Sequence, residues 1–157
     1  MKNLKYILLL ISIIACVQDN LPKPTKIGAN TFGCKVDGRE WIPNGGGGFS
    51  GLPKISADNY AKNLIINSYK SDKSSIKLNI VYPIVEGRIE LKRKNVATYN
   101  ADAYIFFETN ENSTGFMIIT KYDEANGIIS GTFEFNGENV TTKEIKKITK
   151  GRFDAKF

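Results

Sequence analysis

Apolar and polar residues alternate with a period of two in several short stretches, and this pattern restricts the fold more than any other feature of the chain. Ile76, Leu78 and Ile80 alternate with the polar residues Lys77 and Asn79. Further strand-like stretches lie at residues 32–36, 39–42, 88–92, 104–109, 116–122, 128–135 and 148–157. Such alternation places one face of a β-strand in a core and the other in solvent. No stretch combines a 3.6-residue apolar period with helix caps, so the sequence predicts little helix.

The connections between the predicted strands are short. Residues 83–87, 111–115 and 123–127 each join two strands. A parallel crossover needs a dozen or more residues, so loops of this length favour antiparallel neighbours. The predicted fold class is therefore all-β, an antiparallel meander of roughly eight to ten strands. We expect it to be rolled into a flattened β-barrel or a two-sheet β-sandwich, because either arrangement hides the strand edges.

An Asp-Gly pair at residues 37–38 separates two of these strands and is typical of a two-residue hairpin turn. Such a turn pairs Cys34 with Trp41 and Lys35 with Glu40 across the hairpin. The indole of Trp41 offers a large apolar surface, so the face that carries Cys34 and Trp41 should be buried. We therefore expect Cys34 to be shielded from solvent.

The first 15 residues have the organisation of a signal peptide. Lys2 and Lys5 precede an apolar run over residues 6–15. A helix needs about 20 apolar residues to cross a bilayer, so this run is too short to span one and has the length of a signal h-region. The competing interpretation is a buried strand. Ile13, Ile14, Ala15 and Cys16 end the run.

This ending resembles the bacterial lipobox, which implies cleavage between Ala15 and Cys16 and a lipid on the Cys16 sulfur. The three acyl chains implied by the resemblance would hold the protein firmly on a membrane, since a single chain anchors only marginally. The chain has two cysteines. Acylation of Cys16 would leave Cys34 unpaired, whereas a Cys16–Cys34 disulfide is the alternative for a secreted protein. Residues 16–31 then form a lipidated N-terminus and tether, and residues 32–157 form a single β-domain.

The charge of the chain is mildly basic. The formal net charge is +6, and loss of Lys2 and Lys5 with the leader would lower it by two. Six cations gather near the C-terminus, namely Lys143, Lys146, Lys147, Lys150, Arg152 and Lys156. Solvated strand faces account for them; attraction to anionic sugars or lipid headgroups is the alternative. Nucleic acid is not an expected partner outside a membrane.

The sequence offers little for catalysis. It contains no histidine, which removes the commonest general base and metal ligand, and no metal site or cofactor is predicted. Residues 46–51 match G-x-G-x-x-G, but a strand-like stretch follows where a phosphate site needs a helix. Glu90 and Glu134 alternate with apolar neighbours and should face solvent. Asp123 and Asn126 fit a turn better than a calcium loop.

Two stretches, residues 104–107 and 116–119, are apolar on both faces. We interpret them as central strands covered on one side by the other sheet and on the other by a loop, such as residues 43–53. The alternative is an apolar patch that receives a ligand or a partner.

Together with the leader, three motifs at residues 32–43, 127–135 and 148–154 resemble small uncharacterised lipoproteins of Bacteroidota-type bacteria, which are classed as domains of unknown function. The resemblance implies a β-domain anchored to the outer membrane and facing the periplasm or the cell surface. It carries over no catalytic residue.

Two functions follow as hypotheses. The favoured one is a non-catalytic, lipid-anchored domain of the cell envelope that binds a glycan, a small ligand or an envelope protein. The alternative is a hydrolase of surface glycans, which needs two carboxyl groups within about 5–10 Å of one another in a cleft.

Overall fold

Eleven β-strands and their connections make up residues 19–46 and 51–157, the part of the chain that the computed structural model describes. The predicted signal peptide, Cys16 and the centre of the glycine-rich loop lie outside the described residues. The strands are β1 (Thr31–Val36), β2 (Arg39–Trp41), β3 (Ile55–Tyr60), β4 (Asn63–Tyr69), β5 (Ser75–Val81), β6 (Gly87–Leu91), β7 (Val96–Asn100), β8 (Phe106–Glu108), β9 (Gly115–Asp123), β10 (Ile128–Glu138) and β11 (Ile145–Lys156). No helix in the described ranges is long and apolar enough to cross a membrane.

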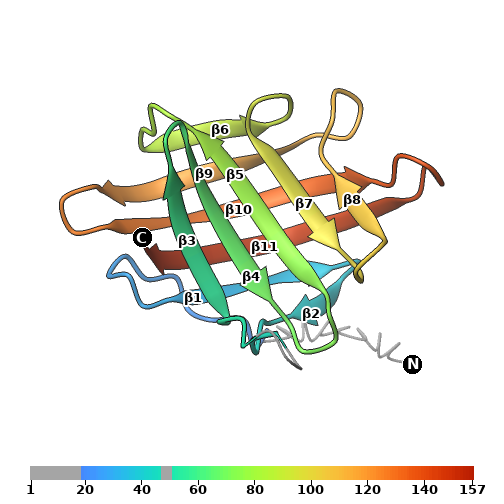
Figure 1. Ribbon diagram of the computed structural model, residues 1–157, viewed down its shortest axis with the longest axis horizontal. Coiled ribbons are helices and arrows are strands. Elements are labelled where there is room, and N and C mark those ends of the chain that lie inside the picture. The colour runs from blue at the N-terminus through green and yellow to red at the C-terminus, as the bar shows by residue number, and fades with distance from the viewer. Residues whose placement is uncertain (1–18, 47–50) are drawn as a thin grey trace, which may run out of the picture.

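All eleven strands belong to one antiparallel sheet with the order β2-β1-β11-β10-β8-β7-β5-β4-β3; off this path, β9 pairs with β10, and β6 pairs with β9. The sheet curls into a half-barrel. Figure 1 shows β3, β4, β5 and β7 crossing steeply in front of β1, β9, β10 and β11. The predicted all-β class is confirmed. The strand count exceeds the expected eight to ten because β2 and β8, with three residues each, are too short to show an alternation.

The prediction that each of the three short loops joins two paired strands is wrong for two of them. Residues 83–87 lead from β5 to β6, but β5 pairs with β4 and β7 whereas β6 pairs with β9. Residues 111–115 lead from β8 to β9, which do not pair either. Both loops carry the chain from one half of the curled sheet to the other, a step that loop length alone does not distinguish from a hairpin. Residues 123–127 do join the paired strands β9 and β10.

The core lies between the two halves of the sheet and follows the predicted alternation. Ile76, Leu78 and Ile80 of β5 are fully buried, while Lys77 is exposed. Opposite them, β9, β10 and β1 contribute large apolar side chains: Met117, Ile119, Phe133, Phe135 and Phe32. The rings of Phe32 and Phe133 are 5.2 Å apart. The inner face of each strand therefore supplies one continuous core.

The β1–β2 hairpin has the predicted register. Cys34 pairs with Trp41 and Lys35 with Glu40. Gly38 has φ +80°, the left-handed conformation that a two-residue hairpin turn requires. Cys34 and Trp41 are buried, and burial strongly raises the pKa of the Cys34 thiol. The lone thiol of the described chain is therefore a packing residue.

Residues 19–30 form no strand, yet they lie against the domain. Asp154 of β11 is buried and accepts hydrogen bonds from the backbone N–H groups of Ile27, Gly28 and Ala29 and from the Thr25 hydroxyl, with lengths of 2.6–3.2 Å. The described part of the expected tether is thus fastened to the sheet.

Candidate functional site

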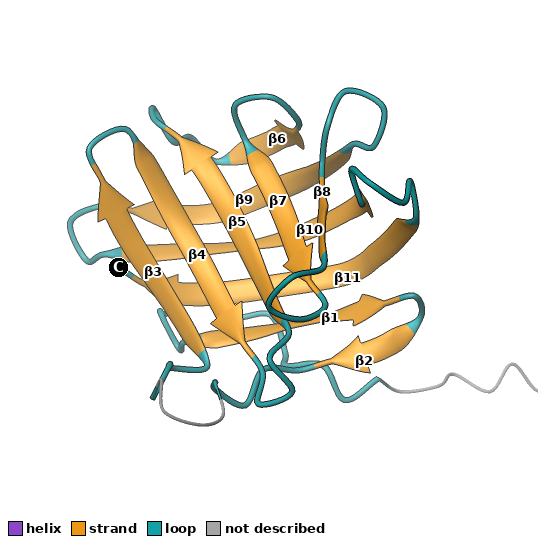
Figure 2. Cartoon of the chain, turned by 45° about the vertical axis from the view of Figure 1, so that its right-hand side comes forward, coloured by secondary structure: helices purple, strands orange, loops and turns teal. Residues whose placement is uncertain are grey.

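A cleft of about 650 Å³ opens at one end of the half-barrel, and we call it the end cleft. It lies between the β1–β2 hairpin, the β4–β5 turn and the segment after β7. Figure 2 shows the hairpin below the ends of β7 and β8. The end cleft is lined by Val36, Asp37, Arg39, Glu40, Trp41, Lys70, Asp72, Ser74, Tyr99, Ala101 and Lys146. Its volume falls in the range of small-molecule sites, about 300–1,000 Å³.

A chain of hydrogen bonds forms one wall of the end cleft. The indole N–H of Trp41 donates to Ser74 Oγ at 2.8 Å, and that hydroxyl donates to Asp72 Oδ1 at 2.5 Å. The Lys70 ammonium lies 3.3 Å from the other carboxylate oxygen of Asp72. Burial would raise the pKa of Asp72, but the hydrogen bonds from Ser74 and the charge of Lys70 outweigh it and lower the pKa. Trp41 is thereby held in a fixed orientation.

Lys146 and Asp37 form another part of the lining. Lys146 Nζ lies 3.2 Å from Asp37 and 2.7 Å from Glu144. The hydrogen bonds to these two carboxylates raise the pKa of Lys146. The backbone N–H of Lys147 donates to Asp37 Oδ1 at 2.9 Å and is the main cause that lowers the pKa of Asp37. At neutral pH Lys146 is therefore a cation and Asp37 an anion.

Tyr99 is one of the side chains in the end cleft with free bonding capacity. It is half-buried, and its ring stacks on Phe107 with centroids 6.0 Å apart. Burial, with a contribution from the nearby Asp72 carboxylate, raises the pKa of Tyr99. Its hydroxyl has no hydrogen-bond partner within residues 19–46 and 51–157. The end cleft thus combines a phenol with ion-paired lysines and carboxylates.

Glu90 and Glu134, two carboxyl groups that a hydrolase could use, come together on the outer face of the sheet. Glu90 of β6 and Glu134 of β10 both lie opposite Phe116 of β9, so the three residues form one row across three strands. Neighbouring strands are about 4.8 Å apart, which puts the two glutamate backbones roughly 10 Å apart. The row lines a shallow depression of about 230 Å³, where the Arg88 guanidinium lies 3.9 Å above the Phe116 ring.

Each glutamate of this row is already engaged. Glu90 accepts a hydrogen bond from Arg88 at 2.9 Å, and Glu134 accepts one from the Lys150 backbone N–H at 3.2 Å. Glu90 is exposed and Glu134 is half-exposed, which agrees with the predicted solvent side.

The two doubly apolar stretches are not covered as expected. Tyr104 is 91% exposed and precedes β8, whereas Phe107 is buried. Residues 43–53 were expected to cover them. In this loop the backbone N–H of Gly45 instead donates a hydrogen bond to the carbonyl of Tyr69, at the end of β4. In β9, Met117 points into the core and Ile118 lies on the open outer face. The structure thus leaves apolar side chains on the surface.

The remaining sequence motifs have structural roles where they are described. Strand β3 follows the glycine-rich loop, and the described residues on either side of this loop form no helix. Asn126 donates from its backbone and side-chain amides to Asp123, which forms the predicted turn. Within the described ranges, no three cysteine, aspartate or glutamate side chains gather as metal ligands would.

Comparison with known families matches residues 54–155 to the family described as Domain of unknown function (DUF6252). The chain belongs to this family. The predicted resemblance to a domain of unknown function is thereby confirmed; that the family consists of lipoproteins stays a prediction. No curated protein and no solved structure matches the chain.

The matched part of this DUF6252 chain begins just before β3 and ends in β11. It contributes Ser74, Tyr99 and Lys146 to the end cleft. The β1–β2 hairpin, with Arg39 and Trp41, completes the cleft from outside the matched residues.

Proposed function

We propose that the protein is a lipid-anchored, non-catalytic binding domain of the cell envelope, and that its end cleft binds a small polar ligand rich in hydroxyl groups, such as a sugar. The observation that carries this proposal is the end cleft itself, an opening of about 650 Å³ with the unpartnered hydroxyl of Tyr99 in its lining. A ligand site of this kind needs concave shape and a few convergent polar groups.

The charges of the end cleft suit binding better than acid catalysis. Arg39 and Lys146 donate hydrogen bonds, while Asp37, Glu40 and Asp72 accept them. The pKa of each of these three carboxyl groups is lowered, chiefly by the hydrogen bonds it accepts, so each is an anion at neutral pH. A glycosidase needs a carboxyl group whose pKa is raised so that it can serve as an acid.

The lipid anchor and the outer-membrane location are the second part of the proposal and rest on the leader and the sequence that ends at Cys16. The Cys16→Ser variant tests them by fractionation of expressing cells. We expect the unchanged protein in the membrane fraction, and the variant either soluble or with its leader uncut. A variant that stays on the membrane with a processed N-terminus would contradict the anchor.

Trp41 makes binding in the end cleft measurable, because it is the single tryptophan of the chain and lies in the cleft wall. We propose titration of its fluorescence with neutral and acidic mono- and oligosaccharides. A binding sugar should shift the emission. The Tyr99→Phe variant removes one hydroxyl and should weaken binding about threefold to tenfold, as loss of one hydrogen bond does.

Tyr104→Phe is the matched control, because it removes the same hydroxyl from an exposed tyrosine outside the end cleft. Its affinity should be unchanged. Equal effects of the two variants would place binding elsewhere. A full panel of sugars that leaves the emission unchanged would contradict a sugar as the ligand.

The register of Glu90 and Glu134 around Phe116 supports hydrolysis as the second candidate function. If this candidate is right, the protein releases product from an envelope glycan, and the Glu90→Gln and Glu134→Gln substitutions each abolish that release. Product release that survives both substitutions would remove this pair from consideration.

A further inference from the structure

We infer that the domain lies directly on the bilayer, with the end cleft beside the lipid headgroups. This inference rests on the proposed lipid anchor at Cys16. It also rests on the attachment of residues 19–30 to the domain, because this attachment leaves only a short free connection between the domain and the lipidated Cys16. The surface around Asp19 is then in contact with the headgroup layer of the membrane.

The attachment begins at Asp19. Its carboxylate lies 3.4 Å from Lys150 Nζ and 3.3 Å from Arg152 Nη2, both on β11. Asn20 follows and donates from its backbone and side-chain amides to the Glu40 carboxylate, at 2.9 and 3.0 Å. Each of these four polar contacts would be weak on its own, because ion pairs at a surface contribute little, but apolar packing supports them.

Leu21 is only 6% exposed, and Pro22 lies against Gly33 of β1. A Cβ at Gly33 would lie 2.7 Å from Pro22 Cδ, so the close approach depends on glycine. The Pro22 carbonyl accepts a hydrogen bond from Arg152 at 3.1 Å, and Asp154 binds the segment further on. Residues 19–30 are therefore part of the domain surface.

Bond geometry now limits the distance between the lipid and the domain. Three residue steps separate Cys16 from Asp19, and an extended chain spans at most about 3.6 Å per residue. The Cα atom of the acylated cysteine is thus within roughly 11 Å of the Cα atom of Asp19. A domain on so short a connection cannot rotate freely away from the headgroups.

The end cleft lies on the same side. Glu40 is bound by Asn20 and also lines the cleft, together with Arg39. The exposed side chain of Arg39 adds positive charge there, which suits an anionic lipid surface, whereas Lys150 is paired with Asp19. The end cleft therefore binds its ligand at the membrane surface.

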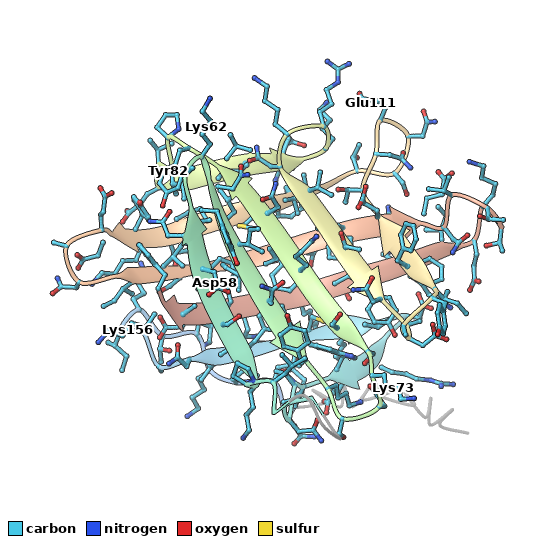
Figure 3. All side chains as sticks on the ribbon, viewed as in Figure 1. Asp58, Lys62, Lys73, Tyr82, Glu111 and Lys156 are labelled. Carbon is cyan, nitrogen blue, oxygen red and sulfur yellow. The ribbon has the colours of Figure 1, made fainter. Side chains whose placement is uncertain are left out.

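Two exposed lysines at opposite ends of β4 provide the test. Lys73 lies at the end of the molecule that carries the cleft, and Lys62 lies at the far end (Figure 3). Strand β4 (Asn63–Tyr69) between them has seven residues and spans about 23 Å. A probe at each position reports which end faces the membrane.

In the experiment, the full acylated Lys73→Cys and Lys62→Cys variants are labelled with bimane. They are placed in vesicles of phosphatidylethanolamine and phosphatidylglycerol with a headgroup-attached nitroxide lipid as quencher. The buried Cys34 should take up little label, which the unsubstituted chain checks. We expect at least threefold stronger quenching at position 73. Equal quenching, or stronger quenching at position 62, would overturn the inference.

A twenty-residue Gly-Ser insertion between residues 18 and 19 tests the cause. It should abolish the difference between the two probes, since the anchor then has slack. A difference that persists would show that the short connection does not set the orientation. Flotation of the vesicles separates this result from failure of the anchor: protein that does not float with them contradicts the proposed lipidation itself.

Discussion

Asp154 is the residue that joins the two ends of the described chain, because its carboxylate binds residues 25–29 and also the Ser130 hydroxyl at 2.7 Å. Burial would raise the pKa of Asp154, but the hydrogen bonds from Thr25, Ser130 and two backbone N–H groups lower it to about 2. The folded state therefore prefers the ionised carboxylate. At the residue scale this single side chain links stability to pH.

The pH dependence has a definite sign. The pKa falls from 3.8 to about 2 on folding, so the stabilisation is complete above pH 3.8 and is lost as the pH falls through 2. The shift corresponds to about 2 kcal/mol. In urea unfolding at pH 6, 4, 3 and 2, Asp154→Asn should lower the free energy of unfolding at pH 6 and weaken its dependence on pH below 4. An unchanged profile in the variant would contradict this role.

Trp41 and Cys34 lead to a second prediction at this scale. Trp41→Ala should lower the free energy of unfolding by about 3–5 kcal/mol, because it empties a core site and leaves Ser74 without its donor. Cys34→Ser should cost about 1–3 kcal/mol. Denaturant unfolding measures both. Labelling of the folded domain by a water-soluble thiol reagent should be slow, and fast stoichiometric labelling of Cys34 would contradict its burial.

At the scale of elements, residues 19–30 behave as a structural element without being a strand or a helix. The backbone N–H groups of Gly28 and Ala29 donate to Asp154, whereas that of Lys26 donates no hydrogen bond to any residue of the described ranges 19–46 and 51–157. Hydrogen exchange should therefore be slow at residues 28 and 29 and fast at residue 26. Asp154→Ala should remove the difference.

Fast exchange at all three amides of the unchanged protein would show that residues 19–30 are a free tether. It would also remove the basis for a short connection to the lipid.

Sequence prediction succeeded for local elements and failed where the partner was distant. The register of the β1–β2 hairpin follows from an Asp-Gly turn and the alternation beside it, all within a dozen residues. The strands joined by residues 83–87 and 111–115 pair instead with strands elsewhere in the chain. No local sequence pattern indicates which distant strand each of them pairs with. The binding of residues 25–29 by Asp154 spans more than 120 positions.

At the scale of the whole molecule, the end cleft was out of reach of sequence analysis for the same reason. Its lining comes from the β1–β2 hairpin, the β4–β5 turn, the end of β7 and the start of β11. Tyr99 and Ser74 carry no motif, and each resembles an ordinary strand or turn residue in the sequence. The sequence predicted that Trp41 is buried, but the cleft beside it also needs Ser74, Tyr99 and Lys146, which lie far away in the sequence.

The measurement that tests the central claim most directly is amide and indole chemical-shift mapping by NMR, with the domain titrated with a sugar that shifts Trp41 fluorescence. We predict that shift changes concentrate on the Trp41 indole, the β4–β5 turn around Ser74, and Tyr99. Changes centred instead on Phe116, Glu90 and Glu134 of the outer face, with the Trp41 indole unmoved, would contradict the end cleft as the binding site.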